Sequence, residues 1–473
     1  MSKLRYGLLA LACAGLLAAA ATLAFGTNAA SGGPGHGHGH GNGHHGPPVS
    51  TDVRQMLNDV SSSNIEQTIT KLVSFGTRHT LSSQTDPNRG IGASTEWVYD
   101  QLQQYAAASG GRMTVEKQSF VQPAGPRIPT PTTITNVIAT LHGSQTESAG
   151  RTYVVSGHLD SRVTDVLNGT SDAPGADDDG SGVAAVLELA RVMSTRHFDA
   201  TIVFAVFSGE EQGTFGSVNF ASRLKAAGTN VAGMFSNDII GSSLGQNGIR
   251  DRRDLRVFAE GPSPQETAAQ AAIRRTMGGE NDSPPRELAR FVREAAQAAI
   301  PKMNVWIIYR RDRFLRGTDD GPFLDQGYPG LRMTEPNEDY RHEHQDVRDE
   351  NGVPFGDRIQ FLDFEYIANV ARVNLAALAA LANGPAAPTG VKVEASTLTV
   401  DTSLEWQPNT EPDLAGYEIV YRDTNMPYWQ HTIPVGNVTS YTVKGITKDN
   451  FLFGVRAVDK DGNRSVVTFP VPK

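Results

Sequence analysis

The stretch "RTYVVSGHLDS", Arg151 to Ser161, predicts the fold of the longest part of the chain. Its first seven residues, Arg151 to Gly157, form the kind of apolar run that a buried strand shows. Polar side chains follow directly, at His158 and Asp160. In open α/β sheets, ligands bind outside the carboxyl ends of the strands. The stretch therefore predicts a buried strand with a functional site at its end.

The sequence on both sides of this stretch alternates between apolar strands and amphipathic helices. Buried strands are predicted at Thr201–Ser208 and Asn304–Tyr309, and helices at Gly182–Ser194 and Phe364–Ala382. Such alternation over residues 51–382 predicts an α/β domain with a mainly parallel central sheet flanked by helices.

The N-terminus has the pattern of an export signal. Lys3 and Arg5 precede a long apolar run, and small residues end at Ala30, so residues 1–30 are predicted to be a signal peptide. The apolar run is long for such a peptide, which leaves an uncleaved membrane anchor as the alternative. Residues 31–50, rich in Gly and His, predict a flexible linker. We expect a secreted, periplasmic or cell-surface protein.

The last part of the chain changes character. Residues 383–390 have the composition of a linker, and short alternating strands with turns over 386–473 predict a small all-β sandwich. This segment resembles a fibronectin type III module, in which Trp406, Tyr417 and Tyr441 match core aromatic positions. The resemblance implies an accessory or spacer role, with a surface or polymer as its ligand.

The composition argues against one class of function and bears on disulfide content. The formal net charge of −9 in 473 residues argues against nucleic-acid binding, which needs clustered Lys and Arg. Cys13 is the only cysteine and lies in the predicted signal peptide, so no disulfide is expected after cleavage. The oligomeric state is not indicated.

Acidic and histidine side chains follow several predicted strands. Besides His158 and Asp160, the sequence places "GADDDGSG" (Gly175–Gly182) before a helix, Glu210 and Glu211 after a strand, Asp238 after a strand-like run, and His342 and His344 farther on. So many carboxylates would repel one another unless cations lay among them. Imidazole with carboxylate suits zinc, and one carboxylate can bridge two metal ions about 3.5–4 Å apart.

This ordered set resembles peptidase family M28, the co-catalytic zinc aminopeptidases with a zinc-exopeptidase fold. The resemblance extends over roughly residues 53–382 and implies two zinc ions per chain. It implies one site of His158, Asp178 and Asp238, and a second of Asp178, Glu211 and His342. His344 is the alternative to His342, which is favoured by the H-x-x-x-D spacing to Asp346.

The resemblance also implies the roles of two further acids. Asp160 is expected to orient His158 through the other ring nitrogen. Glu210 is expected to be the general base that takes a proton from a metal-bridged water, which is the nucleophile. Asp177 and Asp179 are expected to hydrogen-bond within the loop rather than to bind metal.

The function implied is that of an exported dizinc aminopeptidase acting on peptides. Alternatives on the same fold are a carboxypeptidase or dipeptidase, a glutaminyl cyclase, and a binding protein without catalysis. Two departures from the family pattern leave the substrate side chain open: Asp319-Asp320 stands where the family commonly has Asp-His, and Gly241–Ile300 resembles an insertion.

Overall fold

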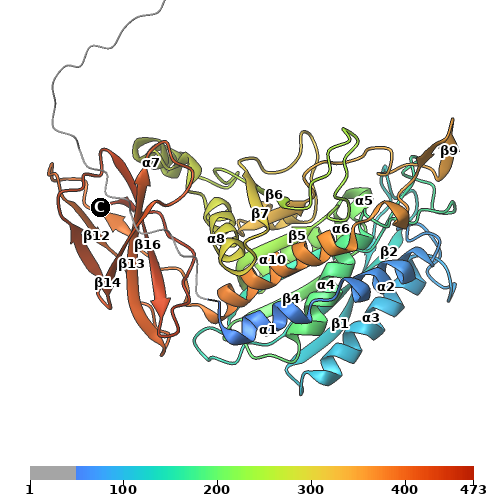
Figure 1. Ribbon diagram of the computed structural model, residues 1–473, viewed down its shortest axis with the longest axis horizontal. Helices are drawn as coiled ribbons and strands as arrows, with labels where there is room; N and C mark the ends of the chain where they lie inside the picture. The colour runs from blue at the N-terminus through green and yellow to red at the C-terminus, as the bar shows by residue number, and fades with distance from the viewer. Residues whose placement is uncertain (1–48) are drawn as a thin grey trace, which may run out of the picture. The chain divides into compact units, whose positions relative to one another are not determined.

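An eight-stranded sheet is the centre of the part of the chain up to Asn383 in the computed structural model, which describes residues 49–473 (Figure 1). The predicted signal peptide and nearly all of the predicted 31–50 linker lie outside these residues. The strands of the sheet are β1 (Met113–Gln122), β2 (Thr132–Leu141), β3 (Arg151–His158), β4 (Thr201–Phe207), β5 (Asn230–Asn237), β6 (Asp254–Ala259), β7 (Asn304–Ile308) and β8 (Gly330–Thr334).

The sheet is parallel at its centre and mixed toward its edges. The strand order is β1-β2-β4-β3-β5-β8-β6-β7. Parallel pairs join β3 to β4, β3 to β5, β5 to β8 and β6 to β7. The pairs β1–β2, β2–β4 and β6–β8 are antiparallel. The predicted α/β fold with a mainly parallel central sheet is therefore confirmed, and β1 and β2 extend it as an antiparallel hairpin.

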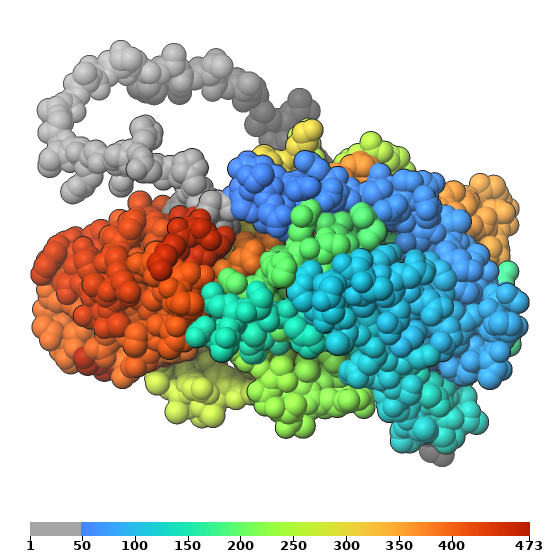
Figure 2. Space-filling view, turned by 90° about the horizontal axis from the view of Figure 1, so that it is seen from below, coloured from blue at the N-terminus to red at the C-terminus, as the bar shows by residue number. Residues whose placement is uncertain are grey.

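Helices cover both faces of the sheet, and neighbouring residues of each strand point to opposite faces. Tyr153 and Val155 of β3 belong to a core shared with α1–α4 and α10, whereas Val154 packs in a separate core with residues of α6 and α9. Much of the face seen in Figure 2 is formed by α1–α3, drawn in blue to cyan. The helices named above are α1 (Thr51–Asp59), α2 (Ser62–Val73), α3 (Ile91–Ala108), α4 (Gly180–Met193), α6 (Phe215–Ala226), α9 (Asp320–Asp325) and α10 (Phe364–Asn383). The short helix α5 (Glu210–Gly213) follows β4.

The closing helix α10 is apolar along most of its length. By length and composition it could cross a membrane, but 72% of its apolar window is buried inside the protein. It begins at Phe364 and is capped by Asp363, whose side chain accepts a hydrogen bond from the backbone N–H of Tyr366. The structure therefore makes α10 a core helix, as the sequence predicts for Phe364–Ala382.

The interpretation of Gly241–Ile300 as an insertion is wrong, because this segment supplies part of the central fold. It contains β6, α7 (Ala268–Met277), the short 3₁₀ helix η1 (Gly279–Asn281) and α8 (Pro284–Ala299). Strand β6 lies between β8 and β7 in the sheet, and α8 joins the core that contains α10. Two prolines at the start of α8 and its many charges conceal the apolar stripe in the sequence, although Pro suits the first turn of a helix.

The C-terminal part forms two small sheets that enclose an apolar core, as predicted for a sandwich. Trp406 and Tyr417 are buried there, with ring centroids 5.3 Å apart. Tyr441 is 40% exposed, so its assignment to the core is wrong. The sheets have the orders β15-β12-β11-β17 and β14-β13-β16, with strands β11 (Lys392–Val393), β12 (Thr402–Glu405), β13 (Leu414–Asp423), β14 (His431–Gly436), β15 (Ser440–Val443), β16 (Phe451–Asp459) and β17 (Val471–Pro472).

Buried polar contacts connect the C-terminal sheets to α8 and to the residues just before it. The indole Nε1 of Trp429 donates to Glu287 Oε2 at 2.9 Å, and Arg422 pairs with Asp282 at 2.5 Å. A third contact lies at the start of β3, where Arg151 pairs with Glu411 at 3.4 Å. All six residues are buried. Because breaking one partner of a buried pair leaves the other uncompensated, these contacts fix the C-terminal sheets to the preceding part.

Substitution Trp429→Phe should lower the free energy of unfolding by about 1–3 kcal/mol, because it leaves a buried carboxylate oxygen without its N–H donor. Urea denaturation followed by circular dichroism measures this loss. Trp306→Phe is the matched control, since Trp306 on β7 is 49% exposed. Equal stabilities of the two variants would contradict a structural role for the Trp429–Glu287 bond.

Candidate metal centre

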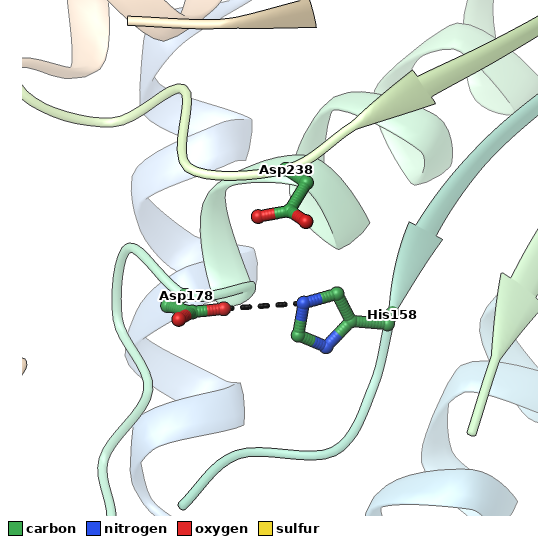
Figure 3. A group of neighbouring side chains, drawn as sticks. All are labelled: His158, Asp178 and Asp238. Atoms are coloured by element: carbon green, nitrogen blue, oxygen red, sulfur yellow. Dashed lines mark ion pairs between the residues drawn. The ribbon is translucent and has the colours of Figure 1, made fainter. Parts of the chain in front are cut away.

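Two groups of His, Asp and Glu side chains in the described part of the chain could each hold a metal ion, and they share Asp178. The first consists of His158, Asp178 and Asp238, with ligand atoms within 4.8 Å of one another (Figure 3). His158 ends β3, Asp238 follows β5, and Asp178 lies in the loop before α4. The three side chains therefore meet at the carboxyl ends of neighbouring parallel strands, as the sequence predicts.

The second group consists of Asp178, Glu211 and His344. The Nε2 atom of His344 lies 2.8 Å from Asp178 Oδ2 and 3.0 Å from Glu211 Oε2. The other oxygen of Asp178, Oδ1, lies 3.1 Å from His158 Nε2. Each oxygen of Asp178 thus faces a different group, which is the arrangement that a bridging carboxylate needs.

The choice of His342 for the second group is wrong in this geometry, and His344 takes its place. The ring of His342 stacks on Phe361 with centroids 3.5 Å apart, and its Nδ1 lies 3.6 Å from Asp339. The H-x-x-x-D spacing favoured His342, but Asp346 is exposed. The chain instead turns at His344, whose φ is 48°, so that its ring points to Asp178.

The neighbours of Asp178 hold the loop by hydrogen bonds, as predicted. Asp177 Oδ1 accepts the backbone N–H of Gly241 at 2.7 Å. Asp179 caps α4 by accepting the N–H of Gly182, and its other oxygen accepts the N–H of His158, both at 2.9 Å. The three consecutive acids therefore differ in role: the outer two fix the backbone, and the middle one faces both groups.

Asp160 orients His158, but through its backbone and not through its carboxylate. His158 Nδ1 lies 3.0 Å from the carbonyl oxygen of Asp160, and 3.9 Å from its Oδ1. The carboxylate instead accepts the backbone N–H groups of Glu210 at 3.2 Å and Glu211 at 3.1 Å, and the hydroxyl of Thr80 at 2.9 Å. Asp160 therefore fixes the start of α5, which carries both glutamates.

Glu210 lies at the open side of the cluster, with 12% of its side chain accessible and Oε2 4.0 Å from His158 Nε2. Burial raises the pKa of its carboxyl well above the ordinary value. The charge of His158 opposes this shift, and those of Glu211 and Asp238 reinforce it. A carboxylate in this position with a raised pKa is suited to accept and release a proton.

Two arginines belong to the site, although no sequence pattern indicated them. Arg332 is fully buried and donates to Asp238 Oδ1 at 3.0 Å. Arg162 Nε donates to Glu211 Oε2 at 2.7 Å, and its NH2 group lies 2.6 Å from His344 Nδ1. Isolated arginines resemble surface residues in a sequence, and only the fold brings them to the acids.

The pair Asp319-Asp320, which departs from the family pattern, is buried. Asp319 Oδ1 accepts the hydroxyl of Ser217 at 2.5 Å, and burial raises the pKa of Asp319 to about 7. Neither residue belongs to the two groups found in residues 49–473.

The residues of both groups fit zinc. Their donors are imidazole nitrogen and carboxylate oxygen, which are usual zinc ligands. Among the residues that the structure describes, Glu211 Oε1 is buried without a hydrogen-bond partner, as expected of an atom that binds a cation. Burial by itself would lower the pKa of His158, but Asp178 and other nearby carboxylates raise it well above the ordinary value. The site therefore attracts positive charge strongly.

Comparison with known proteins agrees with this geometry. The model of peptidase family M28 matches residues 136–354. A "Probable zinc metalloprotease" of Pyrenophora tritici-repentis is 50% identical over 427 residues, covering 90% of this chain and 88% of the relative. The chain belongs to peptidase family M28. A second probable zinc metalloprotease, from Leptosphaeria maculans, is 49% identical over 426 residues, covering 90% of this chain and 98% of that relative.

The fold of this M28 peptidase is similar to that of a solved aminopeptidase. The crystal structure of the LapA aminopeptidase of Legionella pneumophila matches with a TM-score of 0.50 at 18% identity, covering 70% of this chain and 76% of that one. At this identity the likeness concerns the fold.

Substitution His344→Ala should lower the amount of divalent metal bound per chain, because it removes a nitrogen that faces Asp178 and Glu211. His342→Ala is the matched control and should keep the metal content of the wild type, since the ring of His342 stacks on Phe361. Metal content after dialysis, measured by mass spectrometry, distinguishes the two variants. Loss of metal from the His342→Ala variant alone would restore the assignment made from the sequence.

Proposed function

We propose that this M28 zinc metallopeptidase is an exported aminopeptidase with two zinc ions, which removes N-terminal residues from peptides. The observation that carries the proposal is the position of Asp178, with one oxygen toward His158 and the other toward His344. The similarity in fold to the LapA aminopeptidase supports the activity, and the predicted signal peptide supports the export.

In this proposal each ion has three protein ligands. His158, Asp178 and Asp238 would hold one ion, and Asp178, Glu211 and His344 the other. Arg332 and Arg162 donate to Asp238 and Glu211 and so fix the orientation of these carboxylates. Three ligands per ion leave room for water and substrate, as in catalytic zinc sites.

Zinc ions at these positions would supply an acidified water and polarise the scissile carbonyl. Glu210 acts as the general base: its carboxylate takes one proton from the attacking water. The same group then passes this proton to the nitrogen of the leaving amine as the C–N bond breaks. The backbone N–H of Glu210, bonded to Asp160, keeps the carboxylate beside the two groups.

The C-terminal sheets are proposed to be a fibronectin type III module, on the basis of the resemblance around Trp406 and Tyr417. Its buried contacts with Glu287 of α8 and with Asp282 just before α8 favour a role in stabilising the peptidase in addition to binding a surface or polymer.

Hydrolysis of aminoacyl-anilides, with free or blocked N-termini, tests the proposed activity. The free-amine substrates alone should be cleaved, and cleavage should stop on chelation and return with zinc. Cleavage of blocked peptides would instead indicate a carboxypeptidase or endopeptidase. Cyclisation of N-terminal glutamine with one zinc per chain would indicate a glutaminyl cyclase. Two bound ions with no turnover of any substrate would indicate a binding protein.

Substitution Glu210→Gln should lower kcat by several orders of magnitude and leave both zinc ions bound, because the amide cannot take a proton but the ligands remain. Steady-state kinetics and zinc content are measured on the same preparation. Glu66→Gln, on an exposed position of α2, is the matched control. Undiminished kcat in the zinc-loaded Glu210→Gln variant would exclude Glu210 as the base.

A further inference from the structure

Asp357 lies close to the metal centre, although it belongs to neither group of candidate ligands. It follows strand β10 (Val353–Phe355) and is 5% exposed. Its Oδ1 accepts the backbone N–H of Asp177 and its Oδ2 accepts that of Asp178, both at 2.8 Å. One carboxylate thus takes two successive N–H groups of the loop that carries the shared ligand.

The segment that supplies Asp357 also supplies His344. Between them the chain forms a hairpin of β9 (Arg348–Glu350) and β10, and the N–H of Gly356 bonds to the carbonyl of Arg341 at 3.0 Å. This segment therefore approaches Asp178 at two points: His344 faces its side chain, and Asp357 holds its backbone.

The geometry points to Asp357 as a positioning residue that fixes the backbone of Asp178, so that retention of both metal ions depends on it. This inference rests on the proposed two-zinc function. A bridging carboxylate must present one oxygen to each ion, so a small rotation of its backbone weakens both sites together. The two hydrogen bonds of 2.8 Å from successive N–H groups to one carboxyl group hold this part of the loop in one orientation.

Other side chains cannot reproduce this contact. An amide at position 357 has one acceptor oxygen, and its NH₂ group would oppose the second backbone N–H. Substitution Asp357→Asn therefore removes one of the two bonds while preserving the size of the side chain. Asp346→Asn is the matched control, because Asp346 precedes the same hairpin but is exposed.

The test uses the full-length protein and zinc itself. Asp357→Asn should weaken zinc binding by about 10–100-fold, as is typical when a partner of a metal ligand is changed, and excess zinc should restore most of the activity. In the zinc-free protein, the amides of Asp177 and Asp178 should exchange faster with deuterium, measured by mass spectrometry of a peptide spanning residues 173–182. The Asp346→Asn variant should match the wild type in both measurements.

Each outcome decides a separate point. Unchanged exchange, or faster exchange with unchanged zinc affinity, would overturn the role of Asp357 and leave the proposed function intact. A wild-type protein that needs no metal for peptide cleavage would overturn the proposed function, and the exchange measurement would still test the contact. If Asp357→Asn does not fold, Asp357→Glu, which keeps the carboxyl group but moves it by one methylene, should show the same weakening of zinc binding.

Discussion

Mutual repulsion of buried carboxylates is the constraint on which the centre of this protein depends. Asp160, Asp178, Glu211 and Asp238 lie within one cluster at the ends of β3, β4 and β5, all nearly inaccessible to water. Burial and like charge each disfavour ionised carboxylates. Positive groups and N–H donors around the cluster offset this cost by contacting the carboxylates. They are Arg332, Arg162, the two histidines His158 and His344, and the backbone of α5.

Two of the acids hold the ends of strands and the starts of helices together at the site. Asp179 begins α4 and at the same time holds the end of β3, so a helix start and a strand end are joined at the site. Asp160 does the same for the start of α5. The acids that do not face the metal positions thus determine where the other acids lie, and the sheet provides the rigid base.

Much of this arrangement was predictable from the sequence, because it depends on local patterns. The apolar run of β3 and the acids after each strand predicted the sheet and the cluster around Asp178. The choice between His342 and His344 was not predictable, since it depends on a positive φ and on a hairpin that separates His344 from Asp357. Arg162 and Arg332 were missed because they reach the acids only through tertiary contacts.

The contact between the C-terminal sheets and the preceding part of the chain differs in kind from a flexible tether. Its ion pairs, Arg422 with Asp282 and Arg151 with Glu411, are shielded from water, and dissolved ions screen buried pairs much less than exposed ones. The two parts should therefore remain docked across a wide range of salt concentrations. A protein cut within residues 383–390 would keep its halves associated, so the sheets would behave as a subunit rather than as an appendage.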